Sequence, residues 1–303
     1  MPSEVSQMTF ADFALSWLAT WASVRLKASG YTEYESIVRL HLIPAFGELP
    51  LPEVTTERIQ TFVADKMAAG LAARSAINAT IVLKRILGTA VDYGMLPENP
   101  VEKVARPRVE RTEMRFLNPP QLRELIQATQ PSWRLLIALP ALCGLRKGEL
   151  LALTWDDIDL DAMTISITKS MRGGILSTPK TISSFAAVPL ASSLAPLVGQ
   201  RRRQAAGNRL VFCKADGSPL SDATPNRVLD RALAAAYLPG MRFHDLRHSW
   251  AVAHLRAGTD IKTLAALGRW SSTTSLLETY AHVIPTVGGD AVRRLDALVN
   301  GEE

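Results

Sequence analysis

The chain has 303 residues, 47% of them hydrophobic, which is enough for two globular domains with separate cores. It has no run of eighteen apolar residues and no export signal, and its two cysteines fit neither a disulfide framework nor a zinc site, so we expect a cytoplasmic protein without a membrane span. The formal net charge of +5, with the basic excess in the second half, permits a nucleic-acid partner without requiring one.

The first third of the chain predicts four helices, because residues 9–94 carry apolar side chains at helical spacing. The first helix begins near Thr9. The second is expected to begin at Thr32, where Glu35 completes a capping-box pattern, and to end before Pro44. The residues expected to begin or end the other two helices are Thr55, Thr56, Gly70 and Gly94.

A charged stretch without periodicity follows, at residues 104–117, and predicts an extended linker. It separates an expected helical domain at 1–103 from a second domain at 118–303. Asn118 followed by Pro119 is typical of a helix start, so the second domain should open with a helix.

Residues 132–160 predict a buried helix, a break at Gly144 and a second helix from Lys147. Arg146 lies at the break. Its neighbours are core-forming residues, so an arginine here is either functional or a helix cap, and the sequence leaves both readings open.

A small antiparallel sheet should follow. Residues 163–170 alternate in polarity, a turn at Gly173 and Gly174 follows, and Lys180 falls in the loop between the later strands, where a lysine is usually an ordinary surface residue. The remaining elements expected here are a helix at 191–203, a short strand in LVFCKADGSPL and a helix at about 222–237.

Residues 242–282 hold four of the five histidines. A helix closed by Gly258 would place His244 and Arg247 one turn apart on one face. Tyr280 lies near the end of a later helix; taken alone, each of these residues is more often a packing or surface group. The next two helices are expected to begin at Thr259 or Asp260 and at about Ser272.

The candidate residues have complementary chemistry. Guanidinium groups bind two phosphate oxygens at once and favour the added negative charge of a pentavalent transition state. A phenol needs its proton removed, or its phenolate stabilised by cations, before it attacks. The set predicts a site at which a tyrosine attacks a phosphodiester, and its members are Arg146, Lys180, His244, Arg247, the pair Arg269 and Trp270, and Tyr280.

In order and spacing, these motifs resemble the tyrosine recombinase, or phage integrase, family. They are GLRKGELLALTWDDID around Arg146, PKTISSFAAVPL around Lys180, HDLRHSWA with His244 and Arg247, and LETYAHV around Tyr280. The resemblance covers residues 113–283, and residues 9–95 look like the family's helical core-binding domain. It implies a mainly α fold with a small antiparallel sheet, in which a helical DNA-binding domain precedes a mixed α+β catalytic domain.

The resemblance also implies a site-specific recombinase that acts on double-stranded DNA as a homotetramer on paired sites, without cofactor or metal. An accessory directionality factor can be a further partner. In the family the arginines clamp the scissile phosphate and the tyrosine forms a 3′-phosphotyrosyl bond, roles that fall on Arg146, Arg247 and Tyr280. The lysine protonates the leaving 5′ oxygen and the first histidine assists proton transfer, roles that fall on Lys180 and His244.

The chain departs from the family pattern in two places. Phe185 and Ala186 stand where the family often has arginines. The pair Arg269 and Trp270 occupies the family's His or Trp position, with Trp270 ten residues before Tyr280 instead of the usual nine. We predict that Trp270 fills the position, because its N–H can donate to a phosphate and its ring can pack on the tyrosine segment, and that Arg269 faces a DNA backbone phosphate.

Two other functions remain as alternatives. His244 and His248 at i and i+4 could bind zinc in a hydrolase, although Arg247 between them would repel the cation. A non-catalytic DNA-binding relative with a decayed site would explain the irregularity at Arg269. By resemblance, the C-terminal stretch AVRRLDALVN would dock on a neighbouring protomer, and the early first helix leaves no room for an added N-terminal DNA-binding domain.

Overall fold

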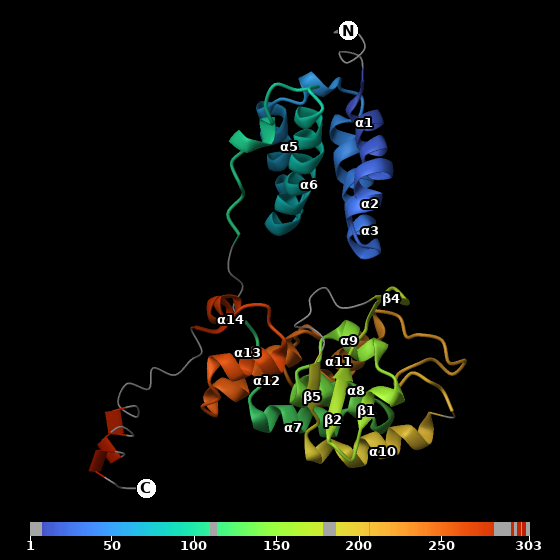
Figure 1. Ribbon diagram of the computed structural model, residues 1–303, viewed down its shortest axis with the longest axis vertical. Helices are drawn as coiled ribbons and strands as arrows, with labels where there is room; N and C mark the ends of the chain where they lie inside the picture. Colours follow the sequence, from blue (N-terminus) through green and yellow to red (C-terminus); the bar gives the residue numbers. More distant parts are fainter. Residues whose placement is uncertain are drawn as a thin grey trace. The chain divides into compact units, whose positions relative to one another are not determined.

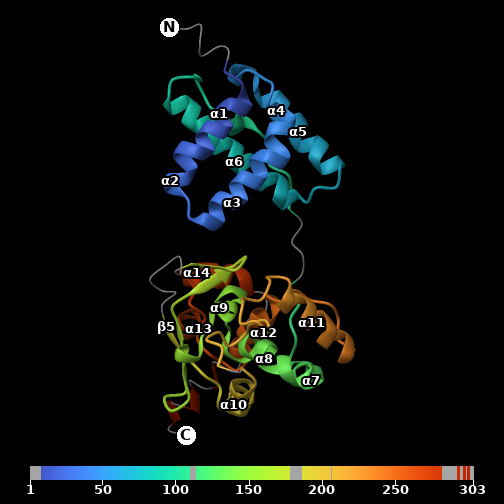
Figure 2. The same ribbon diagram turned by 90° about the vertical axis from the view of Figure 1, so that its right-hand side faces the viewer.

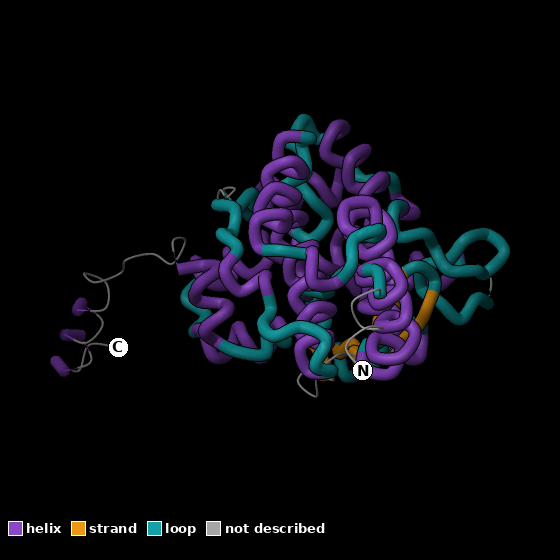
Figure 3. Tube along the Cα trace, turned by 90° about the horizontal axis from the view of Figure 1, so that it is seen from above, coloured by secondary structure: helices purple, strands orange, loops and turns teal. Residues whose placement is uncertain are grey.

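The computed structural model describes residues 8–109, 114–177, 186–205 and 207–281, with short stretches at 292–293, 296–297 and 299–300. The chain divides into two compact units, Met1–Thr112 and Glu113–Glu303, each with its own hydrophobic core. Helices dominate the described residues and strands are few (Figure 3), which confirms the predicted mainly α fold with a small antiparallel sheet. No helix in these ranges is long and apolar enough to cross a membrane.

The first unit is a helical bundle (Figure 1), and its longest helix, α6, lies against the others through a face of buried apolar residues. Thr55 caps α5 as predicted, since its hydroxyl accepts from the Arg58 N–H. The elements of this unit are α1 (Phe10–Trp17), η2 (Leu18–Ala22), α2 (Ser23–Arg25), α3 (Ala28–Ile37), η3 (Val38–Leu42), α4 (Ile43–Phe46), η4 (Leu51–Glu53), α5 (Thr56–Ala68), α6 (Ala73–Asp92) and η5 (Pro100–Lys103).

The predicted bounds of the second helix are wrong at both ends. The helix α3 begins at Ala28, and the Thr32 hydroxyl donates back to the Ala28 carbonyl at 3.0 Å from inside the helix instead of capping its start. The helical path also runs past Pro44, through the π-turn η3 and into α4. Proline lacks an N–H, and the π-turn immediately before it allows the helix to continue without that donor.

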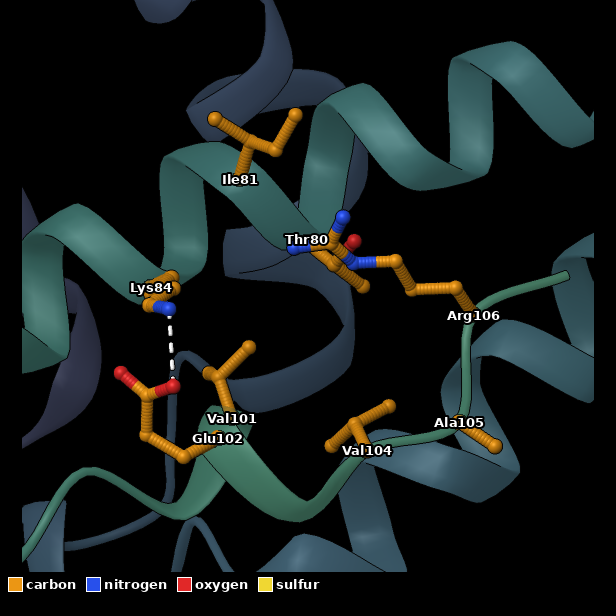
Figure 4. A pocket seen from close by; sticks show the side chains of 8 residues that line it. All are labelled: Thr80, Ile81, Lys84, Val101, Glu102, Val104, Ala105 and Arg106. Atoms are coloured by element: carbon orange, nitrogen blue, oxygen red, sulfur yellow. Dashed lines mark hydrogen bonds and ion pairs between the residues drawn. The ribbon is translucent and has the colours of Figure 1, made fainter.

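A small pocket lies between α6 and η5 (Figure 4). Lys84 and Glu102 form an ion pair of 2.8 Å at its edge, with both side chains partly exposed. Its lining residues are Thr80, Ile81, Lys84, Val101, Glu102, Val104, Ala105 and Arg106. None of the predicted site residues lines it.

In the second unit the other helices pack around α8, whose residues are almost all buried (Figures 1 and 2). The first helix of this unit begins at the N-cap Asn118, as the sequence predicts, and Asn118 forms a capping box with Gln121. The elements are α7 (Pro119–Ala128), η6 (Pro131–Trp133), α8 (Arg134–Cys143), α9 (Lys147–Ala152), η7 (Trp155–Asp157), β1 (Ile158–Asp159), β2 (Thr164–Ile167), β3 (Ser170–Arg172), β4 (Ile175–Ser177), β5 (Ala186–Pro189), η9 (Ser192–Leu194), α10 (Ala195–Gln204), α11 (Thr224–Ala235), α12 (Asp245–Arg256), α13 (Ile261–Gly268) and α14 (Thr273–Tyr280).

The strands form two antiparallel groups, β1-β2-β5 and the hairpin β3-β4. The single strand predicted at 163–170 is therefore wrong, since the chain leaves β2 after Ile167 and starts β3 at Ser170. The break brings β3 against α9 so closely that a Cβ on Gly148 would lie 2.4 Å from the Ser170 hydroxyl. The strand predicted in LVFCKADGSPL is also wrong, because Leu210 and Cys213 pair only in isolated bridges.

Candidate active site

Three segments of the second unit converge on one place: the turn between α8 and α9, helix α12, and the stretch from the end of α13 through α14. The turn depends on Gly144, which has a φ of 65° and whose absent Cβ would lie 2.6 Å from the Trp250 ring on α12. Close packing of α12 on this turn brings Arg247 next to Arg146.

Arg247 is 2% exposed, and its two terminal nitrogens donate to the carbonyls of Gly144 and Gly268. Its guanidinium carbon lies 4.2 Å from the centre of the Trp270 ring. Burial, followed by the charges of Arg146 and Arg269, lowers the pKa of Arg247 to about 9, so the group stays charged at neutral pH. Arg247 has no carboxylate ion-pair partner among the described residues, and a buried cation in this state favours an incoming anion.

Arg146 lies two residues after Gly144, and its side chain is 34% exposed. One terminal nitrogen donates to Glu149 Oε1 at 2.7 Å, and the other donates to the Arg269 carbonyl at 2.6 Å. Its guanidinium is therefore held in place while one side remains open to solvent.

Glu149 is a buried member of this cluster that the sequence analysis missed. Burial alone would raise the pKa of Glu149, but the guanidiniums of Arg269 and Arg146 outweigh burial and hold the pKa below its ordinary value. The site therefore contains one buried carboxylate that the predicted set of residues lacks. The available signal was its position three residues after Arg146, on the first turn of α9.

Tyr280 is fully buried at the end of α14, and its hydroxyl lies 2.5 Å from Nδ1 of His248. Burial raises the pKa of Tyr280, whereas desolvation lowers the pKa of His248 and favours a neutral ring. A neutral imidazole nitrogen can accept a proton from the phenol. In the sequence, His248 is a candidate only as a zinc ligand, and this hydrogen bond was not predicted.

His244 is the residue before α12, and its ring lies edge-on to that of His248 with 4.8 Å between ring centres. Desolvation, His248 and Arg247 lower the pKa of His244. The structure thus brings five of the predicted site residues into one cluster: Arg146, His244, Arg247, Trp270 and Tyr280. The sixth, Lys180, lies outside the described residues, as does Phe185.

The structure separates the roles of Arg269 and Trp270. Trp270 packs between Arg247 and Tyr280, with its ring 6.1 Å from the tyrosine ring in an edge-on arrangement. Arg269 has a φ of 58° and a fully buried side chain that pairs with Glu149 at 2.6 Å, so the prediction that it faces a DNA phosphate is wrong. The buried carboxylate, which the sequence analysis missed, holds the guanidinium inside the protein.

Two further observations concern the zinc alternative and Lys169, a second lysine near the small sheet. His248 Nδ1 is bonded to Tyr280, and no group of three metal-ligating side chains occurs in the described part of the chain. Lys169, the other lysine near the small sheet, pairs with Asp157 at 3.1 Å and donates to the Thr154 hydroxyl. It is thereby held among residues outside the cluster.

Comparisons with known proteins agree on one family. The sequence model of the phage integrase family matches residues 115–286, and that of the phage integrase N-terminal SAM-like domain matches residues 9–67. The ICEBs1 integrase of Bacillus subtilis strain 168 is 26% identical over 90% of this chain and 79% of its own length. A XerC-like tyrosine recombinase of Caldanaerobacter subterraneus is 24% identical over 97% of this chain and 84% of its own.

Solved structures share the fold. The Tn1549 transposon integrase in complex with a circular intermediate DNA has a TM-score of 0.82 at 18% identity, over 96% of this chain and 99% of that one. A lambda integrase tetramer bound to a Holliday junction has a TM-score of 0.72 at 21% identity, over 90% of this chain and 80% of that one.

Proposed function

The chain belongs to the phage integrase family, the tyrosine recombinases, and from this premise we propose that it cleaves and rejoins DNA through a 3′-phosphotyrosyl intermediate. The observation that carries the proposal is the hydrogen bond between the Tyr280 hydroxyl and His248. It lies in the same cluster as the half-buried guanidinium of Arg146 and the buried guanidinium of Arg247. This is the chemistry that a phenol needs to attack a phosphodiester.

Arg146 and Arg247 bind the scissile phosphate in this proposal. Arg247 supplies a buried charge without a carboxylate partner in the described residues, and Arg146 supplies a guanidinium that is open on one side. Both are anchored before DNA arrives, because their other donors bond to the carbonyls of Gly144, Gly268 and Arg269. Donors fixed in advance stabilise the extra negative charge of the transition state without a cost of reorganisation.

The proton of the Tyr280 hydroxyl passes to His248 Nδ1 as the phenol oxygen bonds to phosphorus. The bond from phosphorus to the 5′ oxygen breaks, and that oxygen takes a proton from Lys180. His244, whose ring lies edge-on to that of His248, assists this proton transfer. Trp270 packs between Arg247 and Tyr280 and holds the two side chains in position relative to each other. Tyr280 is fully buried, so DNA binding must expose its hydroxyl to phosphorus while the hydroxyl keeps its contact with His248.

The partner in this proposal is a double-stranded recombination site. The Tn1549 integrase binds a circular intermediate DNA and lambda integrase forms a tetramer on a Holliday junction, and this chain shares their fold. We extend to it a homotetramer on paired sites, in which the segment 291–300 docks on a neighbouring protomer. Residues 291, 294, 295 and 298 of that segment lie outside the described residues.

Covalent trapping of DNA tests the proposal. The chain should form an adduct with a nicked suicide substrate of its own site, with or without EDTA, because no step uses a metal. Tyr280→Phe removes only the nucleophilic oxygen, so it should lose the adduct and keep DNA affinity within a few-fold. An adduct formed by Tyr280→Phe would refute the assignment of the nucleophile, strict metal dependence would favour the zinc hydrolase, and binding without any adduct would favour the decayed relative.

A further inference from the structure

Arg269 is a fully buried arginine that touches the site through both its backbone and its side chain. Its left-handed φ of 58° lets its carbonyl accept from Arg146 at 2.6 Å. Its guanidinium donates to Glu149 Oε2 at 2.6 Å and to the carbonyls of Leu267 at 3.0 Å and Gly144 at 3.3 Å. The residue therefore sits behind Arg146, on the side away from solvent.

The two oxygens of Glu149 accept from different guanidiniums. Oε1 accepts from the Arg146 guanidinium at 2.7 Å, and Oε2 accepts from the Arg269 guanidinium at 2.6 Å and from the backbone N–H of Arg146 at 2.8 Å. The only other buried carboxylate near the site in the described residues, Asp245, pairs with Arg242 at 3.0 Å. The cluster of Arg146, Arg247, Arg269 and Glu149 thus carries three positive charges and one negative charge.

The carboxylate of Glu149 would, without Arg269, have Arg146 as its sole ion-pair partner among the described residues. A carboxylate that pairs with a single guanidinium cancels the charge of that guanidinium and competes with a phosphate for the same N–H groups. With Arg269 present, one guanidinium neutralises Glu149, and the charges of Arg146 and Arg247 both remain available to an anion.

We propose that Arg269 is the internal counter-ion of Glu149, and that its charge leaves Arg146 free to bind the scissile phosphate. Arg269 is a positioning residue in this proposal, because it is buried away from any substrate and acts through Glu149 and Arg146. The inference rests on the proposed function, since it assumes that Arg146 binds phosphate.

Removing the charges of Arg269 and Glu149 together distinguishes a counter-ion role of Arg269 from a purely structural role. Arg269→Met leaves Glu149 to neutralise Arg146, so covalent cleavage at saturating protein should slow by about a hundredfold, the scale for losing one transition-state donor. Glu149→Gln removes the competing charge, so the double variant Arg269→Met/Glu149→Gln should cleave at least about tenfold faster than Arg269→Met alone. A structural ion pair predicts the opposite, because the second substitution would remove a further hydrogen-bond partner from the same buried cluster.

The measurement is the rate of adduct formation on a suicide substrate, with the folded state of each variant checked by circular dichroism. Arg134→Met is the matched control, because Arg134 also donates to backbone carbonyls of this unit, those of Thr129 and Gln127, but touches no site residue. It should cleave at the wild-type rate. If Arg269→Met does not fold, Arg269→Gln gives the same comparison, because its amide can still donate to Glu149 without carrying charge.

A double variant that cleaves no faster than the single variant overturns the counter-ion role. This result is distinct from a failure of the proposed function, which would appear as the absence of an adduct in the wild-type chain or its persistence in Tyr280→Phe.

Discussion

Replacing Trp270 by alanine should separate the stability of this unit from its chemistry. The indole ring lies 4.2 Å from the Arg247 guanidinium carbon, stacks on Trp250 at 6.2 Å and meets Tyr280 edge-on at 6.1 Å. A desolvated cation–π contact contributes about 2 kcal/mol, and each aromatic pair contributes about 0.5–1.5 kcal/mol beyond area burial. Trp270→Ala should therefore lower the free energy of unfolding by about 3–5 kcal/mol, the usual range for a large ring.

Cleavage should suffer as well, because Arg247 and Tyr280 lose the side chain that lies between them. We expect adduct formation at saturating protein to slow by about a hundredfold, the scale for a small misplacement of reacting groups. Trp270→Phe keeps a ring in the same place and should retain most of the rate. Urea unfolding followed by circular dichroism gives the stability, and a suicide substrate gives the rate.

The control is Trp133→Ala, because Trp133 is a half-buried tryptophan packed on the main core of the same unit and lies at the other end of α8 from the Gly144 turn. It should lower stability and leave the rate of cleavage at saturation unchanged. Two results would refute this role of Trp270. One is a loss of less than about 1 kcal/mol in the free energy of unfolding of Trp270→Ala, below the sum of its contacts. The other is equal cleavage rates in Trp270→Ala and Trp133→Ala.

Two further predictions concern proton transfer and the α8–α9 turn. Only neutral His248 accepts the Tyr280 proton, and burial lowers the pKa of His248. The rate of cleavage should therefore be constant at neutral pH and fall with acidification, with a midpoint below about 6.5, the ordinary histidine value. A midpoint above that value, or an unchanged pH profile in His248→Gln, would contradict this role. Gly144→Ala should lower the free energy of unfolding more than Gly258→Ala, by about 1–3 kcal/mol for the overpacking. Both glycines have a positive φ, but only a Cβ at position 144 would meet the Trp250 ring. Thermal or urea unfolding compares the two variants, and equal losses would show that the Trp250 ring moves aside at little cost.

Local sequence patterns predict several helix starts and most of the residue types at the site. Asn118 caps its helix as predicted, Asp260 is the one of the two predicted starts, Thr259 and Asp260, that caps α13, and Ser272 caps α14 close to its predicted start. Each cap needs only a hydrogen bond to a backbone N–H two or three residues later. The failure at Thr32 has the same origin, since its hydroxyl can bond locally either as a cap or to the carbonyl four residues back, and packing of the continuing helix decides between them.

Which side chains meet depends on how the helices pack in the folded unit. Arg146 and Arg247 are recognisable in the sequence, but their contacts depend on packing of α12 against Gly144 and on the carbonyl of Gly268. Glu149 and Arg269 lie far apart in the chain and look like surface residues, because charged side chains are usually exposed. Their burial is possible only because each neutralises the other within the folded unit, and local pattern carries no information about a partner so distant in sequence.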